Sequence, residues 1–167
     1  MENITASHRP TFRGCVLFVT DIARSRDIYE KCFGQVPEVE TALMVAYNGG
    51  LAIWDAEYAR TVLYGDPMAG MGTATRHGAE IWFECDDLAP CLHAVAGAGL
   101  TFLHPVREEA WGQMTFRCFD PDGHLIEVGE TVAGFIGRMY REGMSVAAIA
   151  EKTGVAAPVI EELLGGE

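Results

Sequence analysis

The feature that most constrains the fold is an internal duplication, because residues 13–22 and residues 79–88 align without a gap. Both segments, RGCVLFVTDI and AEIWFECDDL, contain a short run of apolar and β-forming residues, which predicts a strand. In both, an aspartate and an aliphatic residue follow the strand and open a helical pattern, as is typical of a capped helix. The repeated unit indicates that two copies of one structural module make up most of the chain.

Each copy continues with further strands, which gives a β-α-β-β-β module with a helix at residues 22–34 or 88–99. The strands of the first copy are predicted at 13–20, 36–40, 41–47 and 50–55. Those of the second copy are predicted at 79–85, 100–104, 113–119 and 124–128. Each module leaves one sheet face uncovered, so we expect an α+β fold in which two curved mixed sheets form a cleft.

These modules divide the chain into regions. They are an N-terminal arm (1–12), module 1 (13–55), a linker (56–78), module 2 (79–129) and a helical tail (130–167). The modules and the linker together form one domain, 13–129. The linker fits neither the helix nor the strand period, and only its first half could form a helical turn.

The second module ends in a hairpin whose turn is the sequence Asp-Pro-Asp-Gly at residues 120–123. Pro121 sets φ to about −65°, the aspartates can bond nearby backbone, and Gly123 tolerates positive φ, which together favour a tight turn. Glu127 follows on the last strand, on the same face as Leu125. A carboxylate on an otherwise apolar strand indicates a pairing partner or a ligand, because burying it alone costs several kcal/mol.

Three motifs resemble the vicinal oxygen chelate superfamily, which includes glyoxalase I, extradiol dioxygenases, fosfomycin-resistance enzymes and bleomycin-resistance proteins. They are the strand-aspartate-helix segment at residues 19–34, the Trp111-Gly112 pair, and the Asp-Pro-Asp-Gly hairpin with its glutamate. Together with the duplicated module, the resemblance covers roughly residues 13–129. It implies two βαβββ modules around a ligand cleft.

The resemblance also implies where a metal ion would bind. In members that bind metal, four ligands come from the first and last strands of the modules, and the corresponding positions here are Gly14, Trp54, Glu80 and Glu127. Glycine has no side chain and indole has no lone pair for a metal. A catalytic divalent site normally needs three protein ligands, and two carboxylates hold Mg²⁺ or Mn²⁺ only weakly. We therefore expect no metal cofactor, with Glu80 and Glu127 as the weak candidates for a divalent ion.

Three histidines could supply a missing ligand: His77, His104 and His124. The chain has no H-x-H or H-x-x-x-H spacing, which would point to a metal site. We expect His124, which directly follows the Asp-Pro-Asp-Gly turn, to help solvate that turn. We expect His104 to face solvent or bond to backbone.

The strand period of two places several acidic and aromatic side chains on the cleft. The predicted ligand-binding residues are Phe18, Trp54, Glu80, Trp82, Glu84, Met114 and Glu127. Such a lining suits a small cationic aromatic molecule, through stacking, cation–π contacts and charge pairing. The chain resembles bleomycin-resistance proteins in this respect, which sequester a cationic drug without metal or chemistry. The alternative is that Trp54 and Trp82 are core residues and that Glu84 pairs with Arg117 across the sheet.

The two remaining acidic ligand positions, Glu80 and Glu127, are expected to approach each other. Two close carboxylates without a cation repel, so the pKa of one of them should rise. On this hypothesis Glu127→Gln leaves the fold as stable as before, or slightly more stable.

The tail is predicted to form three helices, with Gly143 ending the first, Ser145 capping the second and Thr153-Gly154 leading to the third. The spacing resembles a helix-turn-helix, but the third helix has no Lys or Arg and carries two glutamates, where DNA requires basic or amide groups. We expect no nucleic-acid partner and a role as a cap on the sheet or as a dimer interface. An apolar stripe predicts a homodimer: Phe135, Ile136, Met139, Tyr140, Val146 and Ile149.

The composition narrows the function further. A net charge of −12 disfavours nucleic acid and anionic membranes as partners, and no apolar run is long enough to span a membrane. The five cysteines lack zinc or CxxC spacing, which predicts reduced thiols and a cytoplasmic location. No P-loop, dinucleotide-binding or nucleophile-elbow motif occurs. The leading function is metal-independent binding of a small molecule. The alternatives are a lyase, isomerase or dioxygenase of the superfamily with a non-standard metal site, and a ligand-sensing regulator that uses the tail.

Overall fold

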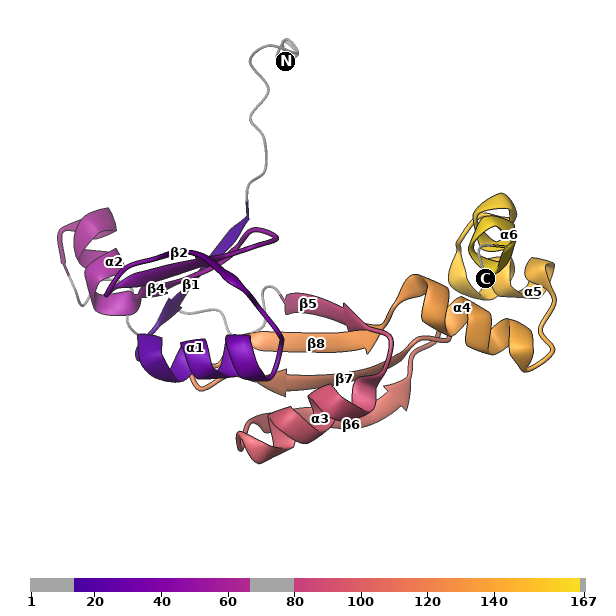
Figure 1. Ribbon diagram of the computed structural model, residues 1–167, viewed down its shortest axis with the longest axis horizontal. Coiled ribbons are helices and arrows are strands. Elements are labelled where there is room, and N and C mark those ends of the chain that lie inside the picture. Colours follow the sequence, from indigo (N-terminus) through magenta and orange to yellow (C-terminus); the bar gives the residue numbers. More distant parts are fainter. Residues whose placement is uncertain (1–13, 67–79, 166–167) are drawn as a thin grey trace, which may run out of the picture. The chain divides into compact units, whose positions relative to one another are not determined.

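The computed structural model describes residues 14–66 and 80–165 (Figure 1). These residues form two compact units, each of which is described by itself. Unit 1 holds the elements from β1 to α2, and unit 2 holds those from β5 to α6 together with Lys31–Phe33. In the part of the chain that is described, no helix combines the length and the apolar character needed to cross a membrane.

Unit 1 contains a four-stranded sheet and two helices. Its elements are β1 (Cys15–Val19), α1 (Ile22–Lys31), β2 (Pro37–Glu40), β3 (Met44–Tyr47), β4 (Leu51–Asp55) and α2 (Ala56–Tyr64). The strand order is β1-β4-β3-β2, with β1 parallel to β4 and the other pairs antiparallel. The side chains of Val19, Tyr29 and Ile53 are fully buried and form part of its core.

Unit 2 repeats this arrangement and adds the helical tail. Its elements are β5 (Glu80–Cys85), α3 (Leu88–Gly97), β6 (Thr101–Glu108), β7 (Met114–Phe119), β8 (Leu125–Glu130), α4 (Val132–Arg141), α5 (Val146–Thr153) and α6 (Ala157–Gly165). The strand order β5-β8-β7-β6 repeats that of unit 1, again with the first strand parallel to the last. The α+β fold of two βαβββ modules with a helical extension is therefore confirmed.

The duplicated aspartates cap the helices at equivalent places. The side chain of Asp21 accepts a hydrogen bond from the backbone N–H of Arg24 at 3.0 Å, and that of Asp87 accepts one from Ala89 at 2.9 Å. Each bond satisfies a backbone donor that the first turn of a helix leaves free. The same local signal thus starts the helix after the first strand of each module.

The segment after module 1 differs from its prediction as a linker with at most a helical turn. Residues 56–64 form a complete helix, α2, which begins where the Asp55 side chain accepts a hydrogen bond from Tyr58 N at 2.8 Å. Gly65 ends it with a φ of 70°, a conformation that glycine adopts without strain. The rest of the predicted linker, with His77, lies outside the described residues.

The hairpin between β7 and β8 is organised by Asp120, which is almost fully buried. Its side chain accepts hydrogen bonds from the backbone N–H groups of Asp122 and His124, at 3.0 and 2.8 Å. Its second oxygen lies 2.8 Å from the imidazole Nδ1 of His124, and Gly123 has a φ of 86°. The turn therefore forms as predicted, and His124 is a bonded part of it.

The three helices of the tail share a hydrophobic core of their own. Its buried members are Phe135, Ile136, Met139, Ile149 and Ile160. Most of the apolar stripe that suggested a dimer interface is thus covered within the tail, whereas Tyr140 remains half exposed. The homodimer stays a prediction, but it loses this part of its motivation.

The tail is also tied to the sheet of unit 2. Arg138 of α4 donates hydrogen bonds to the Glu130 carboxylate at 2.9 and 3.1 Å and to the Gly112 carbonyl at 2.6 Å. Lys152 of α5 bonds Glu108 of β6 at 2.6 Å. These contacts connect two helices of the tail with one end of the sheet.

Candidate ligand-binding site

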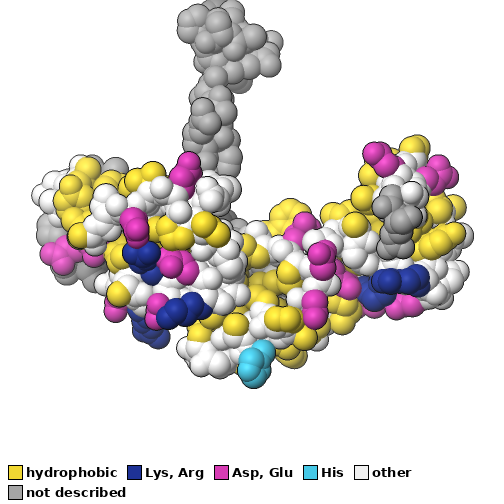
Figure 2. Space-filling view, in the orientation of Figure 1, with side chains coloured by type: hydrophobic (Ala, Val, Ile, Leu, Met, Phe, Trp, Pro, Cys, Tyr) yellow, Lys and Arg dark blue, Asp and Glu magenta, His cyan; other side chains and the backbone are white. Residues whose placement is uncertain are grey.

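A pocket of about 510 Å³ lies on one face of the unit 2 sheet. It is lined by Glu80, Trp82, Glu84, Trp111, Gln113, Glu127, Val132 and Phe135. The sheet and the segment before β7 supply the first six, and α4 supplies the last two. This volume lies in the range of small-molecule sites, roughly 300–1,000 Å³. Figure 2 shows acidic side chains gathered where β5 ends.

The pairing of the strands decides which side chains reach this pocket. In β5 the residues Glu80, Trp82 and Glu84 alternate with residues that face the other side of the sheet. Trp82 is the register partner of Glu127 in β8, and Glu127 is in turn the partner of Arg117 in β7. Side chains of paired residues point to the same face of a sheet. Four of the predicted site residues therefore meet at one place: Glu80, Trp82, Glu84 and Glu127.

Met114 does not lie with them. It precedes Thr115, whose register partner is Gly129, so its side chain points to the opposite face. There it borders a second hollow with Leu88 and Leu92 of α3. The prediction placed the side chain of Met114 on the wrong face of β7. Gln113 lines the pocket instead.

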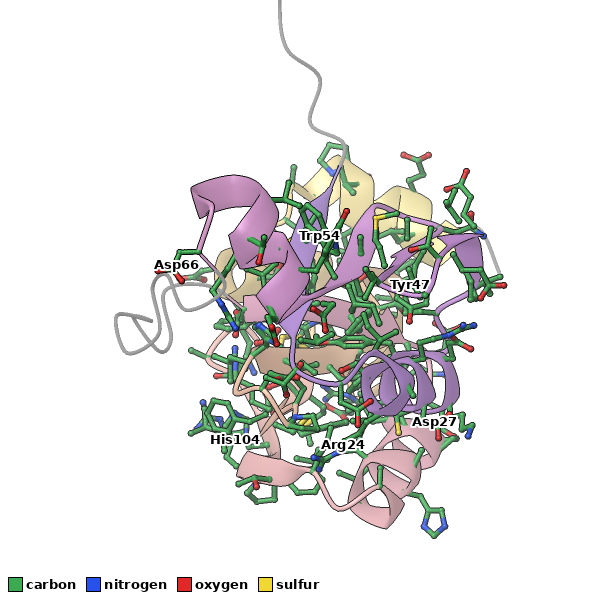
Figure 3. All side chains as sticks on the ribbon, turned by 90° about the vertical axis from the view of Figure 1, so that its left-hand side faces the viewer. Arg24, Asp27, Tyr47, Trp54, Asp66 and His104 are labelled. Carbon is green, nitrogen blue, oxygen red and sulfur yellow. The ribbon has the colours of Figure 1, made fainter. Side chains whose placement is uncertain are left out.

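Phe18 and Trp54 lie in unit 1, where they are register partners in β1 and β4. Their rings meet edge to face with centroids 6.2 Å apart, and Trp54 makes a similar contact with Tyr58 of α2 at 6.0 Å. Figure 3 shows Trp54 beside α2. Phe18 and Trp54 thus lie together in an aromatic cluster of unit 1.

The expected repulsion between Glu80 and Glu127 is relieved by Arg117. The Arg117 Nε atom lies 2.9 Å from Glu80 Oε2, and its Nη2 atom contacts Glu127 Oε2. A guanidinium cation therefore bridges the two carboxylates, and the prediction that they face each other without a cation is wrong. The alternative interpretation was that Arg117 pairs with Glu84. The structure does not contain this pair.

A third carboxylate completes the surroundings of Arg117. Glu109 Oε1 accepts a hydrogen bond from Arg117 Nη1 at 2.6 Å and another from Thr115 at 3.1 Å. The Arg117 hydrogen bond lowers the pKa of Glu109, against an opposing effect of burial, and Arg107 and Thr115 lower it further. Glu109 was not predicted as a site residue, because it lies outside any predicted strand.

Irregularities in β6 bring a histidine to the same cluster. The register with β7 shifts between Phe102 and His104 and again between His104 and Arg107. Each bulge adds a residue to one strand and changes which face the following side chains take. As a result His104 pairs with Arg117, and its Nε2 atom lies 3.2 Å from Arg117 Nη1, while Nδ1 lies 2.8 Å from the Pro105 carbonyl. His104 thus bonds backbone, as predicted, and Arg117 as well.

Two further pocket residues were not predicted as ligand-binding residues. Trp111 donates its indole N–H to Gln113 Oε1 at 2.9 Å, and Gln113 Nε2 donates to the Glu130 carbonyl at 2.7 Å. Gln113 is almost fully buried and its amide is held at both ends. These bonds fix the Trp111 ring at the pocket. The signal available for Trp111 was the Trp111-Gly112 motif, which pointed to the fold.

Glu84 differs from the other acidic residues of the pocket. Desolvation raises the pKa of its carboxyl group, although the residue as a whole is exposed. Among the residues that the structure describes, none forms an ion pair or hydrogen bond with the Glu84 side chain. The pocket thus has an acidic group that has no partner within residues 14–66 and 80–165, close to Trp82 in the same strand.

The residues do not fit a divalent metal ion. A Cβ atom on Gly14 would overlap the carbonyl oxygen of Gly50, so this backbone has no room for a ligating side chain there. Trp54 is engaged in the aromatic cluster of unit 1 and has no donor for a metal. Glu80 and Glu127 are both bound to Arg117. Over residues 14–66 and 80–165, no three histidine, cysteine or acidic side chains lie close enough to hold a metal together.

Comparisons with known proteins agree with this fold. The family model of the glyoxalase-like domain matches residues 12–133. A protein of unknown function from Agrobacterium tumefaciens is 28% identical, with a TM-score of 0.65 over 75% of this chain and 97% of its own. A glyoxalase/bleomycin resistance protein/dioxygenase family enzyme from Burkholderia phytofirmans is 15% identical, with a TM-score of 0.62 over 74% and 100%.

The fosfomycin resistance protein FosX of Mesorhizobium loti is 19% identical, with a TM-score of 0.54 over 83% of this chain and 98% of its own. At this identity the likeness concerns the fold. No curated protein matches the chain. The domain match covers well over half of the chain, and each module by itself has the βαβββ order of elements that the resemblance implied. The chain belongs to the glyoxalase-like family, within the vicinal oxygen chelate superfamily.

Proposed function

We propose that the protein binds a small cationic aromatic molecule in the unit 2 pocket, without a metal ion and without a chemical step. The observation that carries this proposal is the side chain of Glu84, which is acidic, lines the pocket and has no partner among the described residues. An organic ammonium or amidinium group would neutralise it. Such a pairing is favourable in a partly desolvated pocket, where charges interact more strongly than in water.

The aromatic side chains of the pocket support the second half of the proposal. Trp82 is 58% exposed and Trp111 is 38% exposed, which is unusual for side chains of this size. Both line the pocket that contains Glu84. Tryptophan faces attract both aromatic rings and cations, with about 0.5–2 kcal/mol for a cation. A ligand that carries a ring and a positive group would use both features.

The alternative of an enzyme with a non-standard metal site has less support. The Gly14 backbone excludes a ligand, and the candidate pair Glu80 and Glu127 is bound to Arg117. A ligand-sensing role for the tail has one observation in its favour, because Val132 and Phe135 of α4 form part of the pocket wall. A ligand that contacts them would increase the protection of the α4–α6 amides against hydrogen exchange, by stabilising the bound state.

The test is a thermal-shift screen of aromatic amines, each paired with a neutral analogue of the same shape. We expect amines, but not their neutral analogues, to raise the melting temperature, and calorimetry then gives their dissociation constants. Glu84→Gln should raise the dissociation constant of the best amine by about 10- to 100-fold, because the complex loses one charged hydrogen bond.

Glu38→Gln is the matched control, because Glu38 is an exposed glutamate on β2 of unit 1. It should leave the dissociation constant unchanged. Equal binding of amines and neutral analogues, or equal effects of the two substitutions, would remove the basis of the proposal.

A further inference from the structure

One guanidinium group in unit 2 has an unusual set of neighbours. Arg117 contacts three carboxylates through three different nitrogen atoms: Nε with Glu80 at 2.9 Å, Nη1 with Glu109 at 2.6 Å, and Nη2 with Glu127. His104 Nε2 lies 3.2 Å from Nη1. Among the residues that the structure describes, the cluster contains three acidic groups around one central cation. Arg107 contacts Glu109 from the exposed side.

The centre of this cluster is largely withdrawn from water. The side chains of Arg117 and Glu109 are each 13% exposed and that of Glu127 is 7% exposed, whereas Glu80 at the edge is 39% exposed. A buried carboxylate without a cation is strongly destabilised or takes up a proton. Burial lowers the pKa of Arg117, but the hydrogen bonds and charges of Glu80 and Glu109 outweigh it, so its pKa is raised and it stays charged. The acidic groups can be assembled here because the cation is built into β7.

We infer that Arg117 is a resident cation that takes the place a divalent metal ion would need, and that it keeps divalent metal ions out of the pocket. Carboxylate oxygens and an imidazole nitrogen are good ligands for Mn²⁺ and related ions. In the native chain, the guanidinium binds these groups through separate nitrogen atoms, and among the described residues no three of them lie close enough together to hold a metal ion. Removal of the guanidinium would let them converge on an ion. This inference does not depend on the organic ligand of the proposed function.

The test uses two substitutions that change the net charge equally. Arg117→Ala removes the central cation, whereas Arg107→Ala removes an arginine that contacts the same cluster from its exposed side. We expect Arg117→Ala to bind Mn²⁺ with an affinity at least about tenfold higher than native protein and Arg107→Ala, measured by calorimetry with MnCl₂. Manganese should also raise the melting temperature of Arg117→Ala alone. Adding Glu127→Gln to Arg117→Ala should abolish both effects.

Several results would overturn the inference. One is equal Mn²⁺ affinity of Arg117→Ala and Arg107→Ala, and another is tight Mn²⁺ binding by the native protein. Arg117→Met, which keeps an unbranched apolar stem, is made in parallel in case the alanine variant is too unstable. If neither variant folds even with excess Mn²⁺, the inference also fails, because an ion that replaces the cation would restore the fold by mass action.

Discussion

Arg117 of β7 and Glu127 of β8 are register partners on neighbouring strands, and their largely buried side chains form an ion pair on the face of the pocket. The pair joins the two strands of the hairpin that is closed by Asp120. It also assigns different roles to the acidic groups nearby. Glu127 belongs to the framework of the site, whereas Glu84 is the carboxylate that we propose a ligand pairs with.

The first prediction concerns the stability of this framework. Glu127→Gln should lower the free energy of unfolding by about 1–3 kcal/mol, because it removes one charge from a buried pair while Arg117 keeps its other partners. This reverses the effect expected for two repelling carboxylates. Urea denaturation without ligand measures it, and Glu84→Gln is the control that should cause no comparable loss. Unchanged stability of Glu127→Gln would show that the pair contributes nothing net.

The sequence predicted well those features that depend on local signals. The repeated aspartates start α1 and α3, and the Asp-Pro-Asp-Gly turn closes the last hairpin, because capping and turn geometry involve only a few neighbouring residues. The gapless duplication then predicted that the two modules share the same βαβββ order of elements. None of these features requires knowledge of a distant contact.

The composition of the pocket was harder to predict because it depends on register. The predicted hairpin turns around Asp122, and Arg117 and Glu127 are equally distant from that residue along the chain. The prediction of the hairpin therefore already implied that these two residues pair. Counting back from Arg117 in steps of two along the strand would also have placed Gln113 on the pocket face and Met114 on the opposite face. The bulges of β6 have no such signal, and they bring His104 and Arg117 together. The wall formed by α4 depends on how the tail packs.

The second prediction concerns the tail. Ile149 is fully buried in the core shared by α4, α5 and α6, so Ile149→Ala should destabilise the tail by about 2–5 kcal/mol. Hydrogen exchange monitored by mass spectrometry should show faster exchange in the three helices. Val159→Ala is the control, since Val159 on α6 is 46% exposed and its truncation should change stability by no more than about 0.5 kcal/mol. Equal exchange in both variants would mean that the tail does not fold as a packed unit.

The last prediction concerns the pH dependence of the hairpin. Burial opposes the charge of His124, but the hydrogen bond and charge of Asp120, together with the charge of Asp122, outweigh it and raise the pKa of the imidazole above 6.5. A histidine whose pKa is higher in the folded state stabilises the fold fully below its unfolded pKa. This stabilisation is lost as the pH rises from 6.5 through the raised folded pKa. For a partly exposed ion pair it amounts to about 0.2–1 kcal/mol.

Urea denaturation of the native protein and of His124→Gln, at about pH 5.5 and about pH 8.5, measures this contribution. The free energy of unfolding of the native protein should exceed that of the variant by more at the lower pH, where the imidazole is charged. In an Asp120→Asn background the pH dependence of the difference should become much smaller, because the residue paired with the imidazole is then no longer charged. A native-to-variant difference that is the same at both pH values would show that the charged form of His124 gains nothing from the turn.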